Sequence, residues 1–321
     1  MEPHRPIRLD QVQAARDHIA GVATRTPLLR LNHDDAPADI YLKLENLQPT
    51  GAFKLRGACN AMALATEQQL AGGAYTASSG NMAQAVAWNA RRIGVDCTVV
   101  VPDTAPATKI AAVSRYGARI ISVPFDDWWQ ILMTQRHPEI DGRFFIHPSS
   151  NANVMAGYGT IGLEILDDMP DVDAVAIPWG SGGLACALGS VFRILKPDTK
   201  LYAIELDTGA PLAASLAAGE PVEVPYEPSF VDGISGPSIP HEMWPLARKF
   251  LDGSLVVTLQ DIVDAIALVV DRNNVIAEGA GAAPVAAALR GMAGHGKVAC
   301  IVTGGNLDAQ KLVKILGGEV P

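Results

Sequence analysis

The chain lacks the features that mark extracellular, zinc-binding or membrane proteins. Its four cysteines, Cys59, Cys97, Cys186 and Cys300, are scattered without CxxC or CxxH spacing, which argues against a disulfide framework or a zinc site. No stretch reaches the ~18 apolar residues of a membrane span without glycine, proline or charge. The N-terminus also has no apolar signal-peptide core. We therefore expect a cytoplasmic protein with reduced thiols and no membrane contact.

Charged and aromatic residues are also scarce. Only 18% of the residues are charged and 6% are aromatic, whereas 49% are hydrophobic, so small aliphatic side chains dominate. Lys+Arg number 25 and Asp+Glu 34, which gives a net charge of −9 without any basic run. This balance argues against a nucleic-acid partner. High hydrophobicity excludes disorder, and 321 residues of this composition predict an α/β protein of about two domains.

Short apolar runs alternate with alanine-rich segments of helical periodicity. The run 97–101 ends at a proline and is typical of a strand buried on both faces. Further strands are predicted at 40–45, 74–77, 119–123, 174–178, 201–206 and 298–302, and helices at 53–66, 82–93, 108–116 and 184–195. This alternation predicts two open twisted parallel-sheet domains with helices on both faces. We assign residues 1–64 and 150–321 to a large domain and residues 65–149 to a small domain, with the ligand site in the cleft between them.

Gly/Ser-rich turns follow three of the predicted strands, at Ser78–Asn81, Gly180–Gly183 and Thr303–Asn306. In the second turn, strand, glycines and helix come in the order that a phosphate cradle needs, because N–H groups at a helix start attract anions. The turn matches neither GxGxxG nor a P-loop. A plain tight turn is the alternative, and a phosphate on some other kind of cofactor is the functional interpretation.

Lys54 opens a predicted helix directly after the turn at Gly51, in an apolar setting. A lone lysine at a helix start is commonly a solvated side chain. The functional alternative is an amine whose pKa is lowered by burial and by the positive helix end, so that it can form a Schiff base. A phosphate cradle together with a Schiff-base lysine is the equipment of a pyridoxal-phosphate (PLP) site.

Six motifs in order carry a family resemblance over most of the chain. They are Lys43–Gln48, Gly51–Ala58, Ser78–Asn81, Gly157–Glu164, Gly180–Leu184 and Thr303–Asn306. On these motifs the chain resembles the PLP-dependent fold type II (tryptophan-synthase-β-like) family, and within it the serine/threonine dehydratase and serine racemase branch. The resemblance implies pyridoxal 5′-phosphate in the cleft between two α/β domains, an amino-acid substrate and a homodimer.

The resemblance also implies a role for each matching residue. Lys54 would hold PLP as a Schiff base and move the substrate Cα proton, and Ser79 matches a serine that can act as base on the opposite face. Cofactor contacts would come from Phe53 beside the ring, Asn81 at the 3-hydroxyl, Thr303 near the ring nitrogen, and Gly180, Ser181, Gly182, Gly183 and Leu184 at the phosphate. Substrate contacts would come from Ser78, Ser79, Asn81, Met82, Gln84 and Tyr158. A neutral hydroxyl at Thr303 would favour elimination over transamination.

These roles predict a dehydratase, or ammonia-lyase. It would convert a β-hydroxy-α-amino acid of the threonine, serine or phenylserine type to a 2-keto acid and ammonia. Two alternatives stay open. One is a serine-type racemase, because Ser79 fits both activities, and the other is a PLP- or amino-acid-binding protein without turnover.

Several positions depart from the family pattern. Met82 stands where histidine is common, Tyr158 stands where glutamine is usual, and the loop His147–Asn151 replaces an acidic segment. Met82 and Tyr158 make the pocket more apolar, and Trp128 and Trp129 lie in a candidate border of the cleft. These changes favour a β-substituent larger or more apolar than methyl.

The resemblance places a divalent-cation ligand of the racemase branch at Glu205. The sixth residue after it is Pro211 rather than an acid, although Asp207 is a candidate replacement. A hard divalent cation wants several oxygen ligands. We therefore predict no metal among the site residues, with a monovalent ion or none near Glu205.

Overall fold

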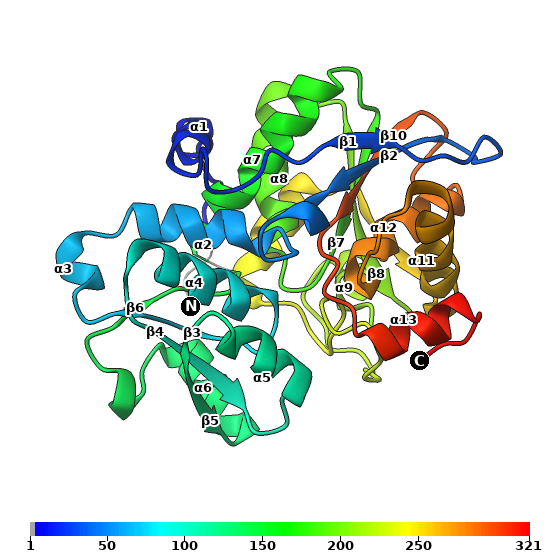
Figure 1. Cartoon of the computed structure of the whole chain (residues 1–321). Helices are drawn as coiled ribbons and strands as arrows, with labels where there is room; N and C mark the ends of the chain where they lie inside the picture. Colours follow the sequence, from blue (N-terminus) through cyan, green and yellow to red (C-terminus); the bar gives the residue numbers. More distant parts are fainter. Residues whose placement is uncertain (1–3, 150) are drawn as a thin grey trace.

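A six-stranded sheet forms one lobe of the computed structural model, which describes residues 4–149 and 151–321 (Figure 1). Its strand order is β1-β2-β10-β7-β8-β9. The strands are β1 (Leu28–Arg30), β2 (Asp39–Leu44), β7 (Ala174–Pro178), β8 (Lys200–Leu206), β9 (Gly253–Val257) and β10 (Lys297–Val302). Neighbours are parallel except β1 and β2, which pair antiparallel. The antiparallel edge strand is a departure from the predicted all-parallel sheet.

A four-stranded parallel sheet forms the other lobe, in the order β5-β4-β3-β6. Its strands are β3 (Ala74–Ala77), β4 (Cys97–Pro102), β5 (Arg119–Val123) and β6 (Phe144–Phe145). All four lie within residues 65–149, and the strands of the larger sheet lie outside that range. Position 150, in the loop singled out above, lies outside the described residues.

Helices cover both faces of the larger sheet, as predicted. On β10, Ala299 and Ile301 pack into one core cluster, whereas Val298, Cys300 and Val302 pack into another. Helices α7 (Ala152–Asp168) and α8 (Gly183–Leu195) contribute to the first cluster, and α11 (Leu259–Asn273) and α12 (Gly279–Leu289) to the second. Burial on both faces explains why these strands are continuous apolar runs rather than alternating ones.

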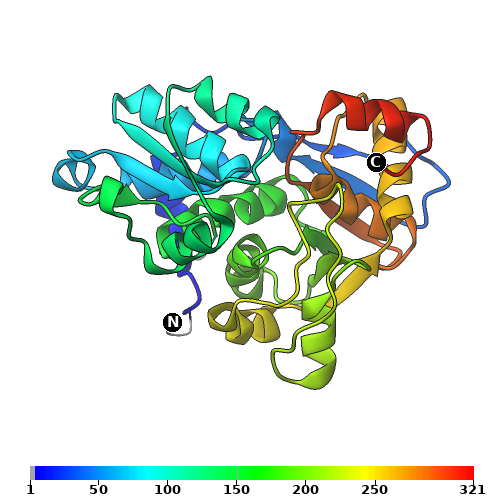
Figure 2. The ribbon, with the colours of Figure 1, turned by 90° about the horizontal axis from the view of Figure 1, so that it is seen from below.

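The remaining helices complete the two lobes, which lie on opposite sides of the molecule in Figures 1 and 2. They are α1 (Leu9–His18), α2 (Lys54–Ala63), α3 (Glu67–Leu70), α4 (Asn81–Ile93), α5 (Ala107–Ser114), α6 (Phe125–Thr134), α9 (Pro211–Ala218), α10 (Trp244–Phe250) and α13 (Ala309–Leu316). Helix α2 contacts both α4 and α7 and so joins the lobes. Among the described residues, no helix is long and apolar enough to cross a membrane.

The predicted helix 53–66 is shorter in the structure, where α2 spans Lys54–Ala63. Thr66 caps the start of a separate helix, α3 (Glu67–Leu70), because its hydroxyl accepts a hydrogen bond from the Gln69 backbone N–H. The Gln69 side chain in turn accepts from the Thr66 N–H, which completes a capping box. A local capping signal therefore overrides the helical periodicity at this point.

Candidate active site

A cavity of about 290 Å³ lies where the carboxyl ends of strands from both sheets meet. The structure brings all but one of the sequence-predicted site residues to its wall. Those that line it are Phe53, Lys54, Ser78, Ser79, Asn81, Met82, Gln84, Gly180, Ser181, Gly182, Gly183, Leu184 and Thr303. The exception is Tyr158. Residues far apart in the sequence thus meet in one place, as expected for parallel sheets whose strands end at the same edge.

Lys54 is the first residue of α2, and its side chain is partly buried in this cavity. Its Nζ donates a hydrogen bond to the Pro148 carbonyl at 2.6 Å and lies 5.0 Å from the centre of the Phe53 ring. Burial lowers the pKa of this amine from 10.5 to about 8, although the nearby Glu278 carboxylate opposes the shift. An amine with this pKa is partly neutral near physiological pH, which suits Schiff-base chemistry.

The turn before α8 has the geometry of an anion cradle. Gly182 adopts a left-handed conformation with φ of 86°, which favours glycine. A Cβ at Gly183 would lie 2.4 Å from the Ser149 carbonyl oxygen, and one at Gly180 would lie 2.9 Å from the Gly233 carbonyl oxygen. No side chain of the described residues caps the start of α8. The turn therefore leaves backbone N–H groups for an anion, and it fits a phosphate.

Asn81 lines the cavity and belongs to a chain of hydrogen bonds. Its Nδ2 donates to Glu278 Oε1 at 2.8 Å, and its Oδ1 accepts from Asn306 Nδ2, also at 2.8 Å. Burial, reinforced by the nearby Asp232 carboxylate, raises the pKa of Glu278 to about 7, and the Asn81 hydrogen bond opposes the shift. The amide of Asn81 is thus held in one orientation by a carboxyl group that titrates near neutral pH.

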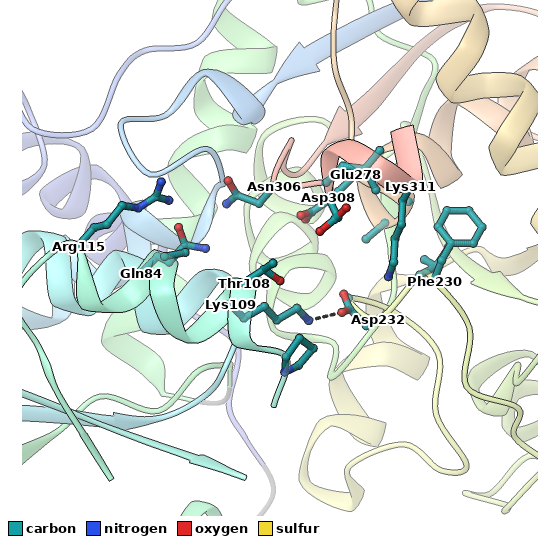
Figure 3. A pocket seen from close by; sticks show the side chains of 17 residues that line it. Gln84, Thr108, Lys109, Arg115, Phe230, Asp232, Glu278, Asn306, Asp308 and Lys311 are labelled. Atoms are coloured by element: carbon teal, nitrogen blue, oxygen red, sulfur yellow. Dashed lines mark hydrogen bonds and ion pairs between the residues drawn. The ribbon is translucent and has the colours of Figure 1, made fainter. Parts of the chain in front are cut away.

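Sequence reasoning missed Glu278, Lys109 and Asp232, which also line the cavity. Lys109 on α5 forms an ion pair with Asp232, and the two side chains point toward each other in Figure 3. All three also line a neighbouring cavity of about 420 Å³. A signal for Glu278 was present, because it is a lone acid directly before the glycine-rich start of an apolar helix. Lys109 and Asp232 carry no comparable local signal.

The aromatic residues predicted near the substrate are placed differently from one another. Trp128 lines the cavity, whereas Trp129 is 51% exposed and does not line it, so the expectation for Trp129 is wrong. Tyr158 is fully buried and lies behind Phe53, with 4.7 Å between the ring centres. It occupies this place because Gly57 has no side chain there. A Cβ at Gly57 would lie 2.5 Å from the Tyr158 ring.

Glu205 is fully buried, and its carboxylate accepts hydrogen bonds from three protein groups. Its carboxylate accepts hydrogen bonds from the Leu212 N–H at 2.9 Å, the Ala213 N–H at 2.8 Å and the Ser254 hydroxyl at 2.6 Å. Burial raises its pKa, and these three bonds oppose the rise. Within the part of the chain that the structure describes, no three His, Cys, Asp or Glu side chains are grouped as metal ligands. Glu205 therefore acts as an acceptor at the start of α9.

The geometry agrees with a comparison against known families. A family model described as "Pyridoxal-phosphate dependent enzyme" matches residues 19–304. The chain belongs to this family. Its cofactor is pyridoxal 5′-phosphate, and the glycine cradle and the lysine of low pKa described above fit that group.

Individual relatives narrow the branch of the PLP-dependent enzymes. The chain is 36% identical to an L-threonine ammonia-lyase of Thermotoga maritima, over 97% of this chain and 78% of that protein. It is 32% identical to the catabolic L-threonine dehydratase TdcB of Escherichia coli K12, over 97% of both chains. Among solved structures, maize serine racemase matches with a TM-score of 0.89 and 31% identity, over 97% of both chains. The predicted family and fold class are thereby confirmed.

Proposed function

We propose that this PLP-dependent enzyme is an ammonia-lyase that converts a β-hydroxy-α-amino acid to a 2-keto acid and ammonia. Threonine is the first candidate substrate, because similar proteins are named L-threonine ammonia-lyase and L-threonine dehydratase. The observation that carries the proposal is one cavity lined by a lysine of lowered pKa, a glycine cradle and the serine-rich start of α4.

Lys54 is assigned the proton transfers. When bound, PLP supplies an electron sink that makes the Cα–H bond of an amino acid acidic. Lys54 Nζ takes up this proton, and its pKa of about 8 provides a neutral fraction near physiological pH. Gly180–Leu184 would hold the phosphate through backbone N–H groups, and Thr303 and Asn81 would contact the ring.

The substrate carboxylate is assigned to the start of α4. Ser78, Ser79 and Gly80 precede this helix, and no side chain of the described segments caps it. Its free N–H groups and positive end favour a carboxylate. The Ser78 Oγ already accepts from the Gly80 N–H at 3.2 Å, which holds the turn in shape. Ser79 lines the same cavity as Lys54 and is the candidate second base.

The reaction balances without a co-reactant. The β-hydroxyl and the Cα proton leave as one water, and the released enamine takes up one water as it hydrolyses to the 2-keto acid and ammonia. Met82 and Trp128 line the cavity and give it an apolar wall for the β-substituent. The test measures kcat/KM for L-threonine, L-serine and phenylserine, and the values rank the three substrates. The proposal predicts that ammonia and 2-keto acid form in equal amounts.

Racemisation is the second candidate activity, because maize serine racemase superposes on this chain with a TM-score of 0.89. Chiral analysis of unreacted serine distinguishes the two activities. Appearance of D-serine faster than ammonia would favour the racemase. We also propose that the protein is a homodimer, on the family resemblance. A cytoplasmic location is proposed because the four cysteines among the described residues are unpaired. Light scattering during size-exclusion chromatography tests the dimer.

A further inference from the structure

Tyr158 stands out because it is a departure from the family pattern that does not line the cavity it was expected to line. Its ring lies 4.7 Å from the Phe53 ring and covers Gly57, three residues after Lys54 in α2. It therefore packs against the first turn of the helix that carries the Schiff-base lysine. The centre of its ring is 5.4 Å from Lys54 Nζ.

The hydroxyl of Tyr158 and the amine of Lys54 share one acceptor. Tyr158 Oη donates to the Pro148 carbonyl at 3.2 Å, and Lys54 Nζ donates to the same oxygen at 2.6 Å. A carbonyl oxygen has two lone pairs and can accept both bonds. Burial raises the pKa of Tyr158, so its hydroxyl stays protonated and remains a donor. The bond ties the loop after β6 to α7 at the atom that accepts from Lys54.

We propose that Tyr158 is a positioning residue for Lys54: it fixes the Pro148 carbonyl, and that carbonyl orients the amine toward the cavity. An amine that donates one N–H to a fixed acceptor has its lone pair and its other protons directed elsewhere. In this cleft the open direction is the cavity itself, since the Phe53 and Tyr158 rings lie 5.0 and 5.4 Å from the Nζ atom. Without the tie to α7, the loop loses the bond that keeps its carbonyl in place.

The inference rests on the proposed function only for the proton transfer, because Schiff-base formation needs the same orientation whatever the reaction. The test variant is Tyr158→Phe, which keeps the ring and removes the hydroxyl. Tyr75→Phe is the matched control. Tyr75 is also buried, and its hydroxyl also donates to a backbone carbonyl, that of Gln135, in the small lobe.

Two measurements are made on each variant. The first is the rate at which the visible Schiff-base band forms when PLP is added to the cofactor-free protein. The second is kcat and KM for L-threonine. We expect Tyr158→Phe to slow band formation and to lower kcat, each about tenfold, with KM changed less than about twofold, because misplacing a reacting group costs rate rather than affinity. Tyr75→Phe is expected to change none of these more than about twofold.

A purely structural role would lower the melting temperature and leave both rates unchanged, and that result would overturn the proposal. If Tyr158→Phe does not fold, Tyr158→Leu, which also lacks a hydrogen-bond donor, replaces it, and a wild-type rate of band formation in that variant would overturn the proposal equally. If L-threonine is not a substrate, the band-formation rate still tests the positioning role. The experiment therefore distinguishes a failure of the proposed function from a failure of the positioning role of Tyr158.

Discussion

Arg56 is the centre of a buried charge network whose disruption has a calculable cost. Its guanidinium donates to both carboxylate oxygens of Glu45 at 2.8 Å and to those of Glu164 at 2.6 and 2.8 Å. Lys43 also donates to Glu164, at 2.5 Å. The two positive and two negative charges balance, and at most 5% of any of these four residues is exposed. We predict that Arg56→Met, which unbalances the network, destabilises the protein strongly.

The magnitude follows from the burial. Removing one partner of a buried ion pair costs about 3–5 kcal/mol, because it leaves an uncompensated charge. With an unfolding entropy of roughly 2.1 cal/mol/K per residue, 321 residues unfolding together convert this loss to a fall of about 4–7 °C in melting temperature. The matched control is Arg30→Met. Arg30 pairs with Asp34 and Asp39 at the surface, so its loss is expected to cost less than about 1 kcal/mol.

The assay is thermal unfolding of the cofactor-free protein, followed by circular dichroism at several pH values. Burial alone would raise the pKa of Glu45, but Arg56 holds it below its ordinary value of 4.5. The stability that this pairing contributes is therefore present above that pH and is lost as pH falls through the folded-state pKa. The deficit of Arg56→Met is thus expected to shrink on acidification. An Arg56→Met protein as stable as Arg30→Met at neutral pH would refute the reasoning.

Three further predictions concern the site. Gly183→Ala places a Cβ 2.4 Å from the Ser149 carbonyl oxygen, so we expect PLP to bind at least about tenfold more weakly, by equilibrium dialysis; unchanged affinity would count against the cradle. The rate at which Lys54 reacts with an amine reagent in the cofactor-free protein should rise with pH and show a midpoint near pH 8, whereas a midpoint near 10.5 would contradict the lowered pKa. Glu278→Gln should lower the midpoint, because the Glu278 carboxylate raises the pKa of Lys54. Because Glu205 already accepts three hydrogen bonds, EDTA should change kcat by less than about twofold, and a loss restored by Mg²⁺ would show that a cation binds.

The sequence predicted the parts of the fold in which local pattern and tertiary burial agree. The strand at 119–123 and the strand at 174–178 have the predicted bounds, and helices cover both faces of the larger sheet. The strands that were missed, β1, β6 and β9, contain few fully buried residues and lack the continuous apolar runs of the central strands. Edge strands of this kind give little periodic signal.

The same distinction applies to the site. Residues in glycine and serine turns at strand ends were predicted, because the motif and its place in the fold coincide. Tyr158 was expected to contact the substrate, but the sequence alone does not show that Gly57 opens a space for its ring. Lys109 and Asp232 meet only through the packing of the two lobes. Contacts between side chains that are far apart in the sequence could not be predicted from the sequence pattern.

Lys54 is proposed to carry out the proton transfers in β-elimination of a hydroxy amino acid. The most direct test incubates the PLP-loaded enzyme with L-threonine and measures ammonia and 2-keto acid, with Lys54→Ala as the comparison. We predict equal amounts of both products from the wild-type protein. From the Lys54→Ala protein we predict neither product, and no absorption band of a Schiff base between PLP and the protein. Product formation by Lys54→Ala at a rate similar to the wild-type protein would contradict it.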